Sequence, residues 1–170
     1  MDGHQSWGRR LNDDEAAFSA ALIAASEAAL RVILSLGIAP GEAEDVLQDA
    51  SIRAWRHREQ RRGDFRPWFV SIAYHEARRP RRRWLTFPSF WSARTQSTEN
   101  EEQIHDVLRL LPSLPMRQRL VLSLRCDAEL STREAADIMG ISEPAAKQLL
   151  ARARESLRRA LDRSRAEAAS

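Results

Sequence analysis

Apolar residues recur at intervals of three and four along much of the chain, the spacing that places them on one face of an α-helix. In residues 15–36 this stripe consists of Phe18, Leu22, Ala25, Ala29, Val32 and Leu36. Asp13 and Asp14 precede the segment as candidate N-caps, and Gly37 follows it as a stop. The pattern therefore predicts a first helix over residues 15–36.

Two more helices are predicted in the first half of the chain. The second covers residues 42–58, with acidic residues in its first turn and arginines in its last turn, as the helix dipole prefers. Its apolar residues, expected to face inward, are Val46, Leu47, Ala50, Ile52, Ala54 and Trp55. After a loop at residues 60–64, a third helix covers residues 65–79, and Pro80 stops it.

The helical pattern breaks down between residues 84 and 100, where Thr, Ser, Pro and the aromatic residues from Trp84 to Trp91 predict a linker. Helices resume at 103–111 and 115–125 and in a tight pair ending near residue 160, before a tail at 162–170 that is expected to fray. No stretch shows the β-branched alternation of a strand. The sequence therefore predicts an all-α chain with two small helical domains, residues 10–84 and 103–162, joined by a flexible linker over residues 85–102.

Residues 130–142 (LSTREAADIMGIS) carry the features of a helix-turn-helix. Ser131 and Glu134 have capping-box spacing at the start of the first helix, and Gly140 stands where the turn needs a positive φ. Ser142 is expected to cap the second helix, whose inner stripe is Ala146, Leu150, Ala153 and Leu157. Such a helix can lie in the major groove of DNA, although a purely structural helical hairpin has the same local pattern.

The charge of the chain favours a polyanionic partner. The formal net charge is only +3, but 27 residues are Lys or Arg, and Lys147 is the only lysine among them. Arginine pairs bidentately with phosphate, and arginines crowd residues 53–83, where the only acids are Glu59, Asp64 and Glu76. This segment is therefore a candidate nucleic-acid-binding surface.

The composition also speaks against other classes of protein. The single cysteine, Cys126, cannot form an internal disulfide or a Cys-rich zinc site, which fits a reducing cytoplasm. The four histidines lack ligand spacing, and no phosphate-binding glycine loop or activated nucleophile is evident. No catalytic residue, metal or cofactor is therefore expected. Residues 16–38 are interrupted by Ser, Glu and Arg and read as too polar for membrane insertion.

Both halves of the chain resemble one family. Residues 114–125 (LPMRQRLVLSLR) together with residues 130–154 resemble the C-terminal domain of bacterial extracytoplasmic-function sigma factors. Residues 44–56 (EDVLQDASIRAWR) resemble the helix with which these factors bind the polymerase clamp, and residues 65–73 (FRPWFVSIA) resemble the helix after it. The two segments occur in the family's order, which is more specific than the helix-turn-helix alone.

The resemblance implies a function without catalysis. A sigma factor binds core RNA polymerase, aims it at a promoter and captures unpaired bases of the non-template strand. The resemblance thus implies a cytoplasmic protein, monomeric when free, that binds core RNA polymerase, double-stranded promoter DNA and the unpaired strand, and that is regulated by an anti-sigma protein.

Three sets of site residues follow from the resemblance. Those implied in polymerase binding are Asp45, Gln48, Asp49, Arg53 and Arg56. Those implied in binding the downstream promoter element, with a flipped base and a single strand, are Arg61, Arg62, Arg66, Trp68, Tyr74, His75 and Arg78, where Trp68 and Tyr74 would stack on bases. Those implied in reading the upstream element are Ser142, Glu143, Ala145, Lys147, Gln148 and Arg152.

Some positions depart from the family pattern. They are Tyr74, His75, Arg79, Pro80, Ala145 and Leu149. The first four leave the details of promoter melting open, and the last two, which are expected to face outward, leave the base preference open. Glu129 replaces a frequent Gly before the helix-turn-helix, which predicts a different turn there.

Two other functions stay open. A stand-alone helix-turn-helix regulator, reading a palindrome as a symmetric dimer, explains the C-terminal half but not the clamp-like helix. A sigma mimic that only titrates an anti-sigma protein explains both halves without transcription.

Overall fold

The structure is a computed structural model that describes residues 3–79 and 110–168, with side chains described from Asp14 onward in the first range. The elements are α1 (Gly3–Ser35), α2 (Pro40–Arg56), the 3₁₀ turn η1 (Arg58–Gln60), α3 (Phe65–Ala77), the 3₁₀ turn η3 (Leu111–Ser113), α5 (Met116–Cys126), α6 (Thr132–Met139) and α7 (Glu143–Ala168). The predicted all-α fold is confirmed, and the described ranges contain no strand.

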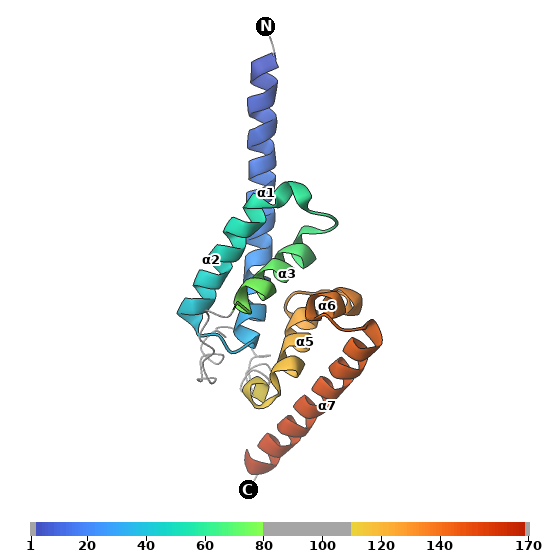
Figure 1. The fold of residues 1–170 in the computed structure, drawn as a ribbon. Helices are drawn as coiled ribbons and strands as arrows, with labels where there is room; N and C mark the ends of the chain where they lie inside the picture. Colours follow the sequence, from blue (N-terminus) through green and yellow to red (C-terminus); the bar gives the residue numbers. More distant parts are fainter. Residues whose placement is uncertain (1–2, 80–109, 169–170) are drawn as a thin grey trace.

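The N-terminal half is a bundle of α1, α2 and α3 (Figure 1). Small side chains line the helix faces that meet, and at most 2% of each is exposed: Ala25, Ala29, Ala43, Ala50 and Ala54. Since alanine carries only a methyl group, the helices approach closely, and the larger Ile33, Val46 and Phe69 fill the space between them. The predicted inner stripes are thus confirmed, except that Ile52 is 45% exposed.

An aromatic cluster joins the three helices beside the loop between α2 and α3. Phe18 of α1 lies edge-on to Trp55 of α2 and to Phe65 of α3, with ring centroids 5.1 and 5.3 Å apart. Phe65 extends the cluster to Trp68 and Phe69, at 5.6 and 5.8 Å. Each such pair contributes about 0.5–1.5 kcal/mol of stability beyond that of burying the rings. The cluster therefore fixes the loop that precedes α3.

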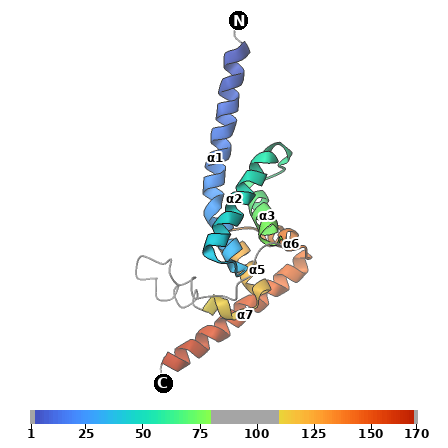
Figure 2. The same ribbon diagram turned by 60° about the vertical axis from the view of Figure 1, so that its left-hand side comes forward.

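α1 starts earlier than the sequence pattern predicts. It begins at Gly3, so Asp13 and Asp14 lie inside the helix and are not its N-caps. The predicted capping role is wrong because no proline interrupts residues 3–35, so the helix runs through these acids. The N-terminal part of α1 extends beyond the bundle, while its C-terminal half packs against α2 and α3 (Figure 1 and Figure 2).

α1 also contains a segment, Asp14–Ser35, whose length and apolar content suffice for a membrane span. Composition alone therefore does not exclude a span here, contrary to the expectation from the sequence. The C-terminal half of the segment instead packs in the bundle, where Ala29, Val32 and Ile33 are fully buried. Packing in the core of the bundle therefore explains why this segment is apolar.

The C-terminal half contains the predicted helix-turn-helix in α6 and α7. The Ser131 hydroxyl accepts from the Glu134 N–H at 3.2 Å, while the Ser131 N–H donates to Glu134 Oε2 at 2.7 Å, so the capping box is complete. Gly140 ends α6 at a φ of 64°. The Ser142 hydroxyl accepts from the Ala145 N–H at 3.3 Å at the start of α7. The predicted caps and turn are confirmed.

α7 is longer than predicted. The tail at residues 162–170 is expected from the sequence to fray from Asp162, but α7 continues to Ala168 and leads away from the rest of the structure (Figure 1). Glu155 forms ion pairs with Arg158 at 2.7 Å and Arg159 at 2.9 Å, at the i,i+3 and i,i+4 spacings that support a helix. These pairs and the alanines of the tail explain why the helix does not stop at residue 161.

Several predictions lie outside the described residues. These are the linker over residues 85–102, the aromatic residues from Trp84 to Trp91, and most of the helix expected at 103–111. The limits of the two domains and of the linker accordingly remain predictions.

The described parts of the two halves pack against each other (Figure 1 and Figure 2). One apolar cluster extends from α1, α2 and α3 into α5, α6 and the turn between them, and its C-terminal members are Leu120, Leu124, Ala128, Leu130, Ala135 and Ile138. A second cluster around Leu114, Val121, Leu122, Leu150 and Ala153 holds α5 to α7. The helix-turn-helix is therefore seated on the N-terminal bundle.

A buried carboxylate links α2 to the end of α3. The Glu76 side chain is only 4% exposed, and its Oε1 accepts a hydrogen bond from Arg53 Nη1 at 3.2 Å. Arg79 Nε lies 3.0 Å from Oε2 as an ion pair without hydrogen-bond geometry. Both arginines are about half exposed, so water stabilises their charges. The buried Glu76 carboxylate has little water, and these two arginines stabilise its negative charge instead.

We expect Glu76→Gln to lower the free energy of unfolding by about 1–3 kcal/mol, because the neutral amide loses both charge-assisted interactions and keeps the burial. Urea denaturation followed by circular dichroism measures the change. Glu59→Gln is the matched control, since Glu59 is 87% exposed and its nearest arginine nitrogen is 3.9 Å away. Equal stability of the two variants would contradict a structural role for Glu76.

Candidate nucleic-acid and protein-binding surfaces

The outer face of α2 carries the residues expected to bind polymerase. Asp45, Gln48, Asp49, Arg53 and Arg56 all lie there, opposite the buried Ala43, Val46, Ala50 and Ala54. The structure thus gathers the predicted residues on one mixed-charge surface, with Arg53 oriented by Glu76.

Ile52 lies within this charged face, a position that the sequence reading missed. The sequence pattern suggested an inner position, but in the helical repeat Ile52 lies four residues from both Gln48 and Arg56, which turns it outward, and it is 45% exposed. If this face binds a partner, Ile52 adds apolar area among the charged groups. The periodicity of α2, counted by position alone, could have found it.

The loop before α3 carries exposed arginines next to a pocket. Arg61 and Arg62 are exposed, and an Arg61 Nη1 donor binds the carbonyl oxygen of Gly63, whose φ is 77°. A pocket of about 380 Å³ lies between α1 and this loop. It is lined by Asp14, Glu15, Ala17, Phe18, Ala21, Arg58, Glu59, Arg61 and Phe65. Its aromatic wall and mixed polar groups can accept a planar polar ring better than a bare phosphate.

The aromatic and polar side chains of α3 divide into two groups. Trp68 is half-buried and His75 is exposed, seven residues apart on one helix face. Tyr74 is only 5% exposed, and its hydroxyl accepts a hydrogen bond from Arg78 Nη1 at 3.0 Å. The expectation that Tyr74 stacks on a base is therefore not supported: α3 turns this ring toward the core and Arg78 covers it, with its guanidinium carbon 5.3 Å from the ring centroid.

The residues expected to read double-stranded DNA lie at the start of α7. Ala145, Lys147, Gln148 and Arg152 are exposed and Glu143 is partly exposed. Lys147 Nζ lies 2.8 Å from Glu143 Oε1, and this ammonium group holds the pKa of the Glu143 carboxyl below its ordinary value.

Leu149 does not belong to the outer face of α7. The sequence predicts that it faces outward in place of a base-reading residue, but it is half-buried against the cluster of α5 and α7. Its apolar side chain gains more from this contact than from water, so its position on α7 is a packing position.

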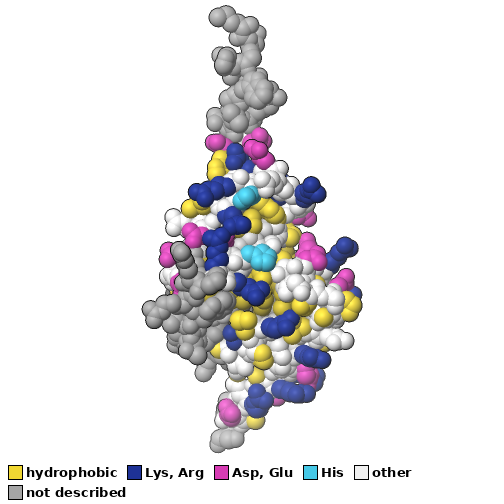
Figure 3. Space-filling model, in the orientation of Figure 1, with side chains coloured by type: hydrophobic (Ala, Val, Ile, Leu, Met, Phe, Trp, Pro, Cys, Tyr) yellow, Lys and Arg dark blue, Asp and Glu magenta, His cyan; other side chains and the backbone are white. Residues whose placement is uncertain are grey.

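Basic side chains connect these regions. Figure 3 shows Lys and Arg side chains along one face of the described structure, over both halves and interspersed with apolar side chains. Since phosphate contacts supply most of the affinity of nucleic-acid-binding proteins, this face can serve a polyanion.

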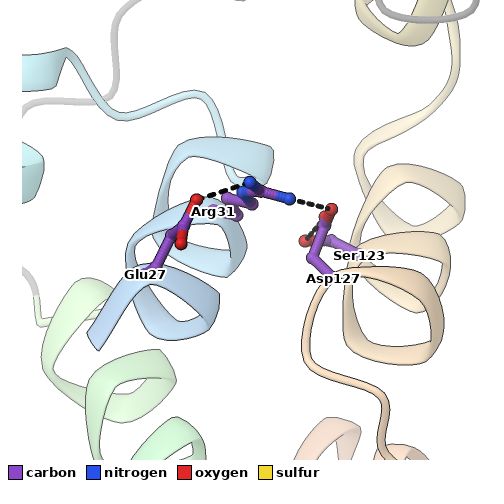
Figure 4. Close-up of polar contacts among 4 residues, drawn as sticks. All are labelled: Glu27, Arg31, Ser123 and Asp127. Atoms are coloured by element: carbon purple, nitrogen blue, oxygen red, sulfur yellow. Dashed lines mark hydrogen bonds and ion pairs between the residues drawn. The ribbon is translucent and has the colours of Figure 1, made fainter. Parts of the chain in front are cut away.

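Polar contacts also cross from one half to the other among the described residues, and the sequence pattern predicted none of those that follow. Arg119 Nε donates to the Ser35 carbonyl at 3.0 Å, at the negative end of the α1 dipole. Arg31 Nη1 lies 3.6 Å from Asp127 Oδ1 (Figure 4). Arg66 Nη1 lies 2.5 Å from Glu129 Oε2. Together they fasten α5 and the turn that follows it to α1 and α3.

Asp127 is the most buried acid of this network. Burial raises the pKa of its carboxyl, and the hydrogen bond from Ser123 at 2.6 Å and the charge of Arg31 only partly oppose this rise. Arg31 is also shared with Glu27 at 2.5 Å (Figure 4). The Arg31–Asp127 pair therefore orients the turn more than it stabilises it.

Glu129 has a left-handed backbone conformation, which glycine adopts more readily than other residues. Its φ is 56°, and a turn different from the family's stays a prediction. The left-handed conformation costs an L-residue about 1–2 kcal/mol, which the burial of Ala128 and Leu130 on either side offsets. The presence of Glu129 where the family often has glycine was the one signal in the sequence that indicated an unusual turn between α5 and α6.

The chain matches two family models. Residues 24–84 match sigma-70 region 2, and residues 104–157 match region 4 of sigma-70. The first range contains most of the α1–α3 bundle, and the second contains α5, α6 and α7 as far as Leu157.

The chain is also similar to characterised proteins. It is 30% identical to the ECF RNA polymerase sigma factor SigM of Bacillus subtilis (strain 168), in an alignment that covers 75% of this chain and 85% of SigM. The fold resembles that of the sigma factor RpoE in complex with the anti-sigma factor NepR from Bartonella quintana, with a TM-score of 0.67 and 22% identity over 88% of this chain and 97% of RpoE. It also resembles CnrH in complex with the cytosolic domain of CnrY, with a TM-score of 0.64 and 24% identity over 87% of this chain and 89% of CnrH.

The two structural likenesses establish the all-α, two-domain fold, while the family models and the SigM similarity establish the relationship. The chain therefore belongs to the extracytoplasmic-function sigma factors of the sigma-70 family.

Proposed function

We propose that this protein is a non-catalytic, cytoplasmic transcription initiation factor that binds core RNA polymerase and directs it to specific promoters. The observation that carries the proposal is the presence of both sigma regions on one chain, with a charged α2 face and a capped helix-turn-helix available for separate partners. A stand-alone helix-turn-helix regulator leaves the α2 face without a role.

The outer face of α2 is the proposed polymerase-binding surface. Asp45 and Asp49 supply negative charge, Arg53 and Arg56 supply positive charge, and Ile52 is the apolar contact among them. Opposite charges in a fixed pattern favour one partner and one orientation, and the apolar side chain adds affinity on desolvation.

The loop and α3 form the proposed site for the unpaired non-template strand. The pocket beside Arg61 and Phe65 would take a flipped base, and Arg62, Arg66 and the exposed His75 would follow the backbone. Trp68, which is half-buried, offers the stacking surface that Tyr74 does not.

The start of α7 is the proposed reader of the double-stranded upstream element. Ser142, Glu143, Ala145 and Gln148 are assigned to base edges, and Lys147 and Arg152 to phosphates. Because Lys147 already pairs with Glu143, its phosphate contact exchanges one anionic partner for another.

An anti-sigma protein is the proposed regulatory partner. The support is that one structural relative, RpoE, is solved with an anti-sigma factor. The exposed α2 face is the surface that such a partner would compete for.

Run-off transcription with core polymerase and a cognate promoter tests the proposal. A specific transcript that depends on this protein is the expected result. Binding to an anti-sigma protein without any transcript favours the sigma mimic, and dimeric binding to a palindrome without polymerase favours the regulator.

We expect Asp49→Arg to reduce the affinity for core polymerase at least tenfold, because it places a like charge beside Arg53 and Arg56 in the proposed surface. Co-migration with core polymerase in analytical size exclusion measures the loss, and helical circular dichroism verifies the fold. Asp162→Arg, the same exchange on the exposed part of α7, is the control and should bind normally. Equal binding of both variants would count against the α2 surface.

Lys147→Ala with Arg152→Ala should weaken binding to the duplex upstream element and lower the slope of log K against log salt by about 1 for each phosphate that is no longer neutralised. Fluorescence anisotropy over a salt series measures this slope. Arg163→Ala with Arg165→Ala removes the same charge from the far part of α7 and should leave the slope unchanged. A wild-type slope in the first variant would remove Lys147 and Arg152 from the interface.

A further inference from the structure

The turn between α5 and α6 contacts the N-terminal bundle through side chains on both sides of Glu129. Ala128 and Leu130 are 0% and 2% exposed and belong to the apolar cluster that continues into α1, α2 and α3. The Leu130 carbonyl is also held by a hydrogen bond from Arg125. The backbone at Glu129 is therefore fixed by its neighbours.

The carboxylate of Glu129 forms an ion pair with Arg66. Glu129 has a φ of 56°, the only left-handed non-glycine residue among the described residues, and its Oε2 lies 2.5 Å from Arg66 Nη1. The two side chains are 73% and 40% exposed, so another anion in solution can reach this pair.

Arg66 is one of the arginines assigned to the unpaired promoter strand. A carboxylate oxygen at this distance occupies the guanidinium as a phosphate oxygen does, with the same charge and the same type of hydrogen bond. A guanidinium has further donors, but the carboxylate neutralises its positive charge. A single strand binds Arg66 mainly because that positive charge neutralises a phosphate, so the ion pair weakens strand binding. Glu129 and a DNA phosphate therefore compete for Arg66.

We propose that Glu129 is an intramolecular competitor of the DNA strand, which couples the docking of the helix-turn-helix half on the bundle to occupation of the strand-binding arginine; the proposal rests on the proposed function of α3. In the docked arrangement the carboxylate lowers the affinity of the free protein for single-stranded DNA. A strand that takes Arg66 breaks one of the ion pairs that cross between the two halves. The other polar links, Arg31 with Asp127 and Arg119 with the Ser35 carbonyl, do not involve this DNA site.

The test uses the full-length protein and a fluorescein-labelled single-stranded oligonucleotide of promoter sequence, with affinity measured by anisotropy at low salt. We expect Glu129→Gln to bind about three- to fivefold more tightly than wild type, the size expected for an exposed ion pair. Glu129→Gly should bind equally tightly and be no less stable, because glycine relieves the strained φ while keeping the turn. Glu155→Gln, which removes the same charge on α7, should bind like wild type.

A double-mutant cycle decides whether the gain arises at Arg66. Arg66→Gln alone should weaken strand binding, and adding Glu129→Gln to it should give no further gain. An unchanged affinity in Glu129→Gln, or the same gain with and without Arg66, would overturn the proposal.

A distance measurement separates this inference from the proposed function. Spin labels at Ser19→Cys and Arg163→Cys in a Cys126→Ser background report the separation of the halves without DNA or polymerase. Glu129→Gln should shift or broaden the distance distribution toward longer values, and an unchanged distribution would overturn the coupling. If the distances change but neither the wild type nor any variant binds the strand even with core polymerase, the proposed strand site itself is wrong.

Discussion

The packing of the C-terminal half of α1 is the constraint on which the other elements depend. Its fully buried Ala29, Val32 and Ile33 belong to a cluster that includes α2 and α3 and also α5, α6 and their connecting turn. Arg119 then binds the carbonyl of Ser35 at the end of the helix, where the unpaired carbonyls need donors. One helix end therefore organises both the bundle and the seat of the helix-turn-helix.

The proposed binding surfaces are built on rigid supports. On α2, four buried small or branched residues fix the helix, and the buried Glu76 orients Arg53 from behind, so the outer face presents its charges in a defined pattern. At the loop before α3, the aromatic cluster around Phe65 holds the backbone beside the pocket. In α6 and α7, the capping box and the left-handed Gly140 set the angle between the helices. Fixed geometry of this kind reduces the ordering cost when a partner binds.

The polar contacts between the two halves differ in their effect from the apolar core of the same interface. Burial of Asp127 is unfavourable enough to raise the pKa of its carboxyl, and the Arg66–Glu129 pair is largely solvent-exposed, so neither contact adds much stability. Burial of apolar surface holds the halves together, whereas the ion pairs determine which side chains meet. Such pairs are easily exchanged for those of a charged partner, and this suits a protein whose proposed ligands are nucleic acid and polymerase.

The sequence by itself determined the features that depend on neighbours within about one helical turn. The inner stripes, the capping box at Ser131, the turn at Gly140 and the mixed charges of α2 could all be read from spacing, because a helix relates residues three and four apart. Tertiary structure alone decided that Tyr74 and Leu149 turn inward and that Arg66 meets Glu129 across 63 positions of the chain. Those outcomes depend on which apolar surfaces bury each other, and local spacing carries no information about that choice.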